Sequence, residues 1–221
     1  MRYLIFGAGA VGSLIGGMLS QAGHDVSFLG RGAHVKSVAA TGLRIVWPDR
    51  PVQACRPAVI DALSELGGRR PDLVILSVKS YALQEALDEL SAKYDPLPVC
   101  LLLQNGVGNE ELALRRLPSE RLVSGAVTYS VSRPEPGTIR VNTHSKGLSL
   151  APIRPSERRL VTVWVELFRQ AGLRTWLAPD YRSLKWSKLL LNLTGNALPA
   201  LLDAEPAAMV RHREALEIEA A

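Results

Sequence analysis

The sequence predicts an α/β fold: a doubly wound parallel sheet of the Rossmann type with an antiparallel extension, followed by a short, partial all-α C-terminal segment. A βαβ unit opens the chain, strand and helix patterns alternate up to residue 117, and hairpin-like patterns begin at residue 122. Alternating strands and helices are typical of parallel sheets covered by helices on both faces. Short strands separated by Pro and Gly are typical of antiparallel pairing.

The opening unit is a strand, a tight turn, a helix and a second strand. Residues 2–6 are rich in strand formers, Gly7 ends that run, and residues 11–20 have helical apolar spacing. Gly23 closes the helix, and residues 25–29 form the next strand. A unit of about thirty residues is expected to make a right-handed parallel crossover.

Further along the chain, apolar spacing predicts a strand at 73–78, a helix at 81–92, a strand at 99–103 and a helix at 110–117. Residues 128–141 contain Pro134, Pro136 and Gly137 between strand-like runs, which predicts hairpins that extend the sheet over a cofactor crevice. Next come a helix at 157–171, a strand at 173–177 and a long helix from 181 to about 202. We expect one domain over 1–178 and the start of a truncated helical segment, for substrate binding or dimerisation, over 179–221.

The composition fits a globular protein, because 47% of residues are hydrophobic and 21% are charged. The net charge is +5, but Lys and Arg are scattered and form no basic block, so we expect no nucleic-acid partner. Such a balance suits an anionic cofactor and an anionic small-molecule substrate. The segment after residue 178 is too short to bury its own core, so we expect it to pack on the first domain or self-associate, in the simplest case as a homodimer.

Cysteine usage and hydropathy limit the setting of the protein. Cys55 and Cys100 lie in unrelated segments, which predicts ordinary thiols rather than a disulfide framework or a metal site. No segment sustains the eighteen apolar residues of a membrane-spanning helix. We therefore expect a cytoplasmic protein with no membrane partner and no metal.

The residues after the first strand fit the dinucleotide-binding fingerprint: Gly7, Ala8, Gly9, Ala10, Val11 and Gly12. The first Gly makes the turn, the second lets a pyrophosphate approach the backbone, and the third allows the helix to pack on the strand. The same spacing without this context would indicate only a glycine turn, but here it lies inside a βαβ unit. We therefore expect the pyrophosphate on the helix N-terminus.

The end of the second strand decides which dinucleotide binds. An acidic residue there would bind the free ribose hydroxyls of NAD, but this sequence has Gly30 and Arg31. The guanidinium of Arg31 can pair with a 2′-phosphate, which favours NADP; the alternative is an Arg that only lies on the surface.

Two polar residues follow later strands at the same edge of the sheet. Lys79 follows the strand at 73–78 and faces either the crevice or solvent. Asn105, in Gln104-Asn105-Gly106, offers a donor and an acceptor to a nicotinamide or a substrate, although Asn-Gly also favours a plain turn.

The last helix carries the most informative polar pattern. Lys188, Asn192 and Asn196 recur every four residues and so project from one face amid leucines. Buried asparagines need partners, so a bound polar ligand would explain them. Hydrogen bonds within a core or a dimer seam are the structural alternative.

Together these positions resemble the ketopantoate reductases, or 2-dehydropantoate 2-reductases, across nearly the whole chain. The motifs follow the family's order: Gly7-x-Gly9-x-x-Gly12 with Arg31, Lys79, Gln104-Asn105-Gly106-Val107-Gly108, and Trp186-Ser187-Lys188-Leu189-x-x-Asn192-x-x-x-Asn196. The resemblance implies that NADPH delivers a hydride to the C2 ketone of 2-dehydropantoate. It also implies that Lys188 is the acid, that Asn105, Asn192 and Asn196 orient the substrate, and that Lys79 and Arg31 hold the cofactor.

The chain also departs from the family pattern. Family members usually continue as a longer helical domain, which supplies a serine and a glutamate to the substrate site, and those positions are absent here. Two other functions therefore stay open: reduction of a different 2-oxo acid, and binding of NADP without catalysis.

Overall fold

A mixed sheet forms the centre of the molecule. The computed structural model describes residues 1–143, 147–192, 200 and 203. Within these ranges the main sheet has eight strands, in the order β12 (Thr175–Leu177), β11 (Leu148–Pro152), β8 (Leu122–Val127), β7 (Val99–Leu102), β6 (Leu73–Leu76), β1 (Arg2–Phe6), β2 (Asp25–Leu29) and β5 (Ala58–Ile60). The strands from β5 to β8 pair in parallel, and β11 pairs antiparallel with β8. The expected Rossmann-type sheet with an antiparallel extension is confirmed.

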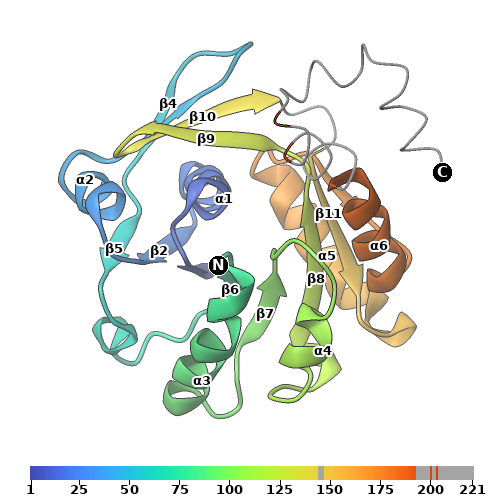
Figure 1. The fold of residues 1–221 in the computed structure, drawn as a ribbon. Helices are drawn as coiled ribbons and strands as arrows, with labels where there is room; N and C mark the ends of the chain where they lie inside the picture. Colours follow the sequence, from blue (N-terminus) through green and yellow to red (C-terminus); the bar gives the residue numbers. More distant parts are fainter. Residues whose placement is uncertain (144–146, 193–199, 201–202, 204–221) are drawn as a thin grey trace, which may run out of the picture.

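Helices cover both faces of this sheet (Figure 1). They are α1 (Ala10–Gln21), α2 (Ala33–Thr41), α3 (Leu83–Lys93), α4 (Asn109–Ala113), α5 (Arg158–Gln170) and α6 (Tyr181–Asn192), with short 3-10 turns at Leu63–Leu66, Ser80–Ala82, Ser119–Arg121 and Pro155–Glu157. Along β1 the side chains alternate between two cores. Tyr3 and Ile5 pack with α1 and α5, whereas Leu4 and Phe6 pack with α3 and α4. This alternation explains why β1 reads as a continuous apolar run.

The predicted hairpin forms, but it belongs to a second sheet. Its strands β9 (Ser130–Glu135) and β10 (Thr138–Thr143) join β3 (Leu43–Val46) and β4 (Gln53–Cys55) in the order β4-β3-β10-β9. This sheet lies across α1 (Figure 1). A Cβ at Gly17 of α1 would lie only 2.7 Å from the side chain of Leu43, so that glycine permits the close approach. The expectation that the hairpin extends the main sheet is therefore wrong, because β10 pairs with β3 instead.

Several short elements lack a sequence signal strong enough to predict them: α2, β3, β4, β5 and β11. The helix expected at 110–117 is shorter and ends at Ala113. The helix α6 packs against β8 and β11, so the part of the segment after residue 178 that the structure describes as α6 packs on the main sheet, as expected. The boundary near residue 178 stays a prediction. None of the helices in the described ranges combines the length and apolarity needed to cross a membrane.

Candidate functional site

The glycine loop after β1 has one position for each of the three predicted roles. Gly7 adopts φ +101°, which only glycine tolerates easily, and its N–H donates to Leu29 O. A Cβ at Gly12 would lie 2.5 Å from Gly7 O, so this glycine lets α1 approach the strand. A Cβ at Gly9 would meet nothing within 4 Å. The open space above Gly9 is where a pyrophosphate would approach the backbone.

This loop borders a hollow of about 650 Å³ at the C-terminal edge of the sheet. Its lining includes Gly7, Gly30, Arg31, Val78 and Tyr81. The volume is within the range of small-molecule and cofactor sites. The structure thus brings the glycine loop and Arg31 to one hollow, while Lys79 lies exposed just after β6 and outside that lining.

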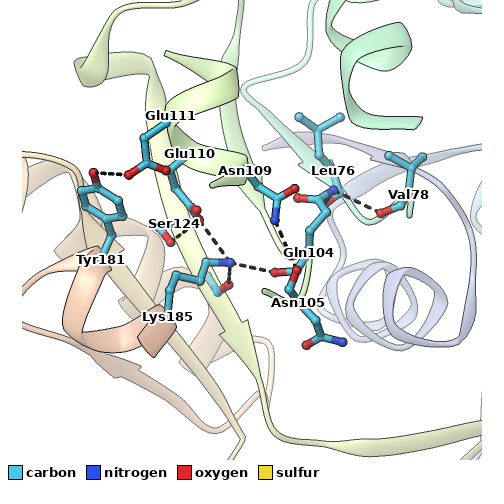
Figure 2. Close-up of polar contacts among 11 residues, drawn as sticks. Leu76, Val78, Gln104, Asn105, Asn109, Glu110, Glu111, Ser124, Tyr181 and Lys185 are labelled. Atoms are coloured by element: carbon cyan, nitrogen blue, oxygen red, sulfur yellow. Dashed lines mark hydrogen bonds and ion pairs between the residues drawn. The ribbon is translucent and has the colours of Figure 1, made fainter. Parts of the chain in front are cut away.

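At the neighbouring part of the same edge, Lys185 of α6 is buried, with 3% of its surface exposed. Its ammonium donates to Gln104 O at 2.8 Å and to Gly125 O at 2.9 Å, and it lies 3.1 Å from Glu110 Oε1 (Figure 2). These partners come from the loop after β7, from within β8 and from α4. An ammonium has three N–H groups, and all three have partners here. Lys185 therefore fixes α6 to the sheet.

Glu110 is the counterion of Lys185 and is itself fully buried. Its Oε1 also accepts a hydrogen bond from the Ser124 hydroxyl at 2.7 Å. Burial lowers the pKa of Lys185, and the nearby carboxylate of Glu110 opposes that effect. Removal of either charge would leave the other in a medium of low polarity.

The loop after β7 is held by its own side chains. Gln104 donates from Nε2 to Leu76 O and Val78 O, at 3.0 and 3.2 Å, which ties the end of β7 to the end of β6. The Asn109 amide donates to Asn105 O at 3.2 Å. The side chain of Asn105 is exposed and points away from Lys185 and Glu110 (Figure 2). Asn105 is therefore available to a ligand at this edge.

Lys188 lies one turn beyond Lys185 on α6 and is half-buried. It lines a separate hollow of about 410 Å³, together with Thr128, Ser149 and Trp176. Thr128 directly follows β8, so Lys188 lies over the end of that strand. Asn192 is at the end of the described part of α6 and is half-buried. Asn196 lies outside the described residues, as does most of the helix expected between residues 193 and 202. The structure thus places Lys188 over the end of β8 and Asn105 after the end of the adjacent parallel strand β7, and Asn105 does not line the hollow beside Lys188.

Sequence reasoning missed the buried cluster of Lys185, Glu110, Ser124 and Gln104. One signal for Lys185 was present. Tyr181, Leu184, Lys185 and Lys188 follow the i, i+3, i+4, i+7 spacing of a buried helix face, so a lysine occupies a core position. Nothing in the local sequence identifies Glu110 as its partner, since the two residues lie 75 positions apart.

Comparisons with known proteins agree on one family. Residues 3–154 match the family model described as ketopantoate reductase PanE/ApbA. A 2-dehydropantoate 2-reductase of Pyrococcus horikoshii is 34% identical over 95% of this chain and 66% of its own length. One of Halobacterium salinarum is 32% identical over 95% of this chain and 68% of its own length. The chain spans about two thirds of the length of these curated relatives.

The fold agrees as well. A crystal structure of 2-dehydropantoate 2-reductase from Geobacter metallireducens superposes with a TM-score of 0.89 at 27% sequence identity. The match covers 99% of this chain and 71% of that one. The arrangement of strands and helices in the described residues is therefore shared with that enzyme.

Proposed function

Because the chain belongs to the ketopantoate reductase PanE/ApbA family, we propose that it is an NADPH-dependent 2-dehydropantoate 2-reductase. The reaction reduces the C2 ketone of 2-dehydropantoate to the hydroxyl of pantoate, on the route to pantothenate and coenzyme A. The protein is proposed to act in the cytoplasm on this small 2-oxo acid.

One observation carries the proposal: the residues proposed to bind the cofactor and those proposed to bind the substrate lie along a single edge of the sheet. Because β1, β6, β7 and β8 are parallel, their C-terminal ends lie side by side. The glycine loop follows β1, Asn105 follows β7, and Lys188 lies over the end of β8. Ligands of open α/β sheets bind at this edge.

The nucleotide half of the edge fits a dinucleotide. The open space above Gly9 admits a pyrophosphate, and α1 begins there without a side-chain cap, so its first N–H groups are available to an anion. Arg31 borders the same hollow and favours the 2′-phosphate of NADP over the free hydroxyl of NAD. We assign to Lys79 a supporting contact with the cofactor. Bound NADPH supplies the hydride.

On the substrate side, Lys188 is proposed to donate a proton to the ketone oxygen as the hydride reaches C2. The hydride and this proton together convert the ketone to an alcohol, and Lys188 is then reprotonated from solvent. Asn105, Asn192 and Asn196 are proposed to hold the substrate by hydrogen bonds. An ammonium beside the developing alkoxide stabilises negative charge where it forms.

The test is NADPH oxidation with 2-dehydropantoate by the 221-residue chain and by Lys188→Ala, with NADPH binding measured separately by nicotinamide fluorescence. We expect kcat to fall about 10²- to 10⁴-fold in the variant, since a positioned acid contributes that much. The Kd for NADPH is expected to stay within about twofold. Lys93→Ala is the matched control: Lys93 is a half-buried lysine at the end of α3 that donates to Gly67 O at 3.3 Å and lines neither hollow, so both quantities are expected to stay unchanged.

The outcomes separate the candidate functions. Binding of NADPH without turnover of 2-dehydropantoate by the wild-type chain would contradict the reductase proposal. Turnover of another 2-oxo acid at a higher kcat/KM would replace the substrate but keep the reaction. Equal turnover by wild type and Lys188→Ala would remove Lys188 from the acid role.

A further inference from the structure

Arg31 also borders a second hollow, apart from the one beside the glycine loop. Its volume is about 430 Å³, and it lies between the turn that follows β2 and the strand β9. Arg31 contributes to the lining of both hollows. Arg133, on β9, lines the second one together with Pro134 and Glu135. Two arginines that are about a hundred positions apart in sequence therefore line one hollow.

Among the described residues, neither Arg31 nor Arg133 forms an ion pair. Glu135 borders the same hollow, but its carboxylate lies 3.6 Å from Arg44 and accepts a hydrogen bond from the Thr138 hydroxyl. Two unneutralised guanidinium groups beside one hollow favour a bound anion, above all one with oxygens for more than one Arg.

The strand that carries Arg133 is fixed to the glycine loop. Gly137, at the turn of the hairpin, donates its N–H to His34 Nδ1 at 3.1 Å, so the proton of the neutral ring is on Nε2. That Nε2 lies 3.0 Å from Ser13 Oγ, which in turn donates to Ala8 O at 3.2 Å. Gly137 O also accepts from the Arg44 N–H at 2.9 Å. The hairpin is thus held in place relative to Ala8 and the turn that carries Arg31.

We propose that Arg133 is a second determinant of cofactor choice, which binds the adenosine 2′-phosphate of NADP together with Arg31. The inference rests on the NADP preference proposed above and adds a residue from a different element. Arg31 borders both hollows, so a phosphate that pairs with Arg31 can lie in the second hollow. Arg133 lines that same hollow and can bind the phosphate there. Paired guanidinium groups suit a phosphate because each provides a planar set of donors to its oxygens.

The test compares two nucleotides that differ by one phosphate. Adenosine 2′,5′-bisphosphate and adenosine 5′-monophosphate are titrated by calorimetry into wild type, Arg133→Ala, Arg133→Lys and Arg31→Ala. Arg140→Ala is the matched control, because Arg140 is an exposed residue of β10 that does not line the hollow. NADPH and NADH are titrated in the same way.

Loss of one charge-assisted contact is expected to weaken the bisphosphate about tenfold in Arg133→Ala, and to leave the monophosphate within about twofold. Arg133→Lys is expected to recover part of the loss, and Arg140→Ala is expected to match wild type. NADPH is expected to follow the bisphosphate, and NADH the monophosphate.

Two results would overturn the role of Arg133 alone: unchanged bisphosphate affinity in Arg133→Ala while Arg31→Ala loses it, or an equal loss for both nucleotides. A wild-type protein that binds both nucleotides equally would instead overturn the NADP preference itself, and Arg133's role with it.

Discussion

Two regions of the same sheet edge are constructed in different ways: the glycine loop (residues 7–12) and the region around Lys185 and Glu110, called here the α6 end. At the glycine loop, six consecutive residues provide the turn, the open approach and the close packing, and all of them are uncharged. At the α6 end, a buried ammonium is held by residues from three other elements, and the bond from Lys185 to Gln104 O spans 81 positions. The conformation of the glycine loop depends on glycines that have no side chain, whereas the α6 end depends on a buried charge with specific partners.

The difference shows where each end is sensitive to change. At the loop, an added methyl group affects function through the space that it fills. At the α6 end, the loss of one charge affects the fold, because the remaining charge stays buried. Two lysines of α6 show the same difference between fold and function within one helix. Lys185 is buried and contacts three protein groups, whereas Lys188 is half-buried and borders a hollow.

The largest expected effect is on stability at the α6 end. Glu110→Gln keeps the size of the side chain but removes the charge that compensates Lys185. We expect the free energy of unfolding to fall by about 3 kcal/mol, as is typical when a buried ion pair loses one member. Urea unfolding followed by tryptophan fluorescence measures it.

Glu111→Gln is the matched control for this variant. Its carboxylate accepts a hydrogen bond from the Tyr181 hydroxyl at 3.0 Å, but the residue is exposed, so we expect a loss of less than about 1 kcal/mol. Similar losses in the two variants would show that burial of the Lys185–Glu110 pair has no special importance.

The next effect distinguishes two glycines of the loop. Gly12→Ala would place a methyl group 2.4 Å from Ser77 Oγ and 2.5 Å from Gly7 O, so we expect a loss of about 1–3 kcal/mol in unfolding free energy. Gly9→Ala has free space around the new methyl group, and Gly9 is in an extended conformation that alanine adopts. We expect Gly9→Ala to keep wild-type stability and to weaken NADPH binding. Tight NADPH binding by Gly9→Ala would show that the pyrophosphate does not approach there.

The sequence predicts the glycine loop better than the α6 end, for a physical reason. The glycine fingerprint is local, so its turn and its packing follow from six adjacent residues. The main parallel strands are equally clear, because they are buried on both faces and read as apolar runs. Short strands such as β3 and β5 have too few residues for a periodic signal, and their pairing depends on distant partners.

The α6 end required the tertiary structure. The spacing of Lys188 and Asn192 on one helix face could be predicted, and the spacing of α6 also signals the buried position of Lys185. The partners of Lys185 could not be predicted, because they come from the loop after β7, from β8 and from α4. The same holds for Arg133. Its place beside Arg31 depends on the pairing of β10 with β3, whereas the sequence predicted a hairpin that extends the main sheet.

The smallest expected effect is a pH dependence at His34, the residue that connects the hairpin to the loop. Burial, and then the charge of Arg133, lower the pKa of His34 below its usual value of 6.5. The unfolded chain therefore takes up the proton more readily than the folded one. Stability is expected to be unaffected above about pH 6.5 and to fall as the pH drops below that value. Protonation would also remove the acceptor that His34 Nδ1 offers to the Gly137 N–H.

His34→Asn removes the titration and keeps an acceptor, so we expect the urea midpoint of this variant to change less than that of wild type between about pH 7.5 and pH 5.5. His24 is the control, because burial and the N-terminal charge also lower its pKa. His24→Asn should keep the part of the pH dependence that comes from His34. If His34→Asn shows the same pH dependence as wild type, the proton uptake that destabilises the fold occurs elsewhere, and the link between hairpin and loop does not depend on a neutral imidazole.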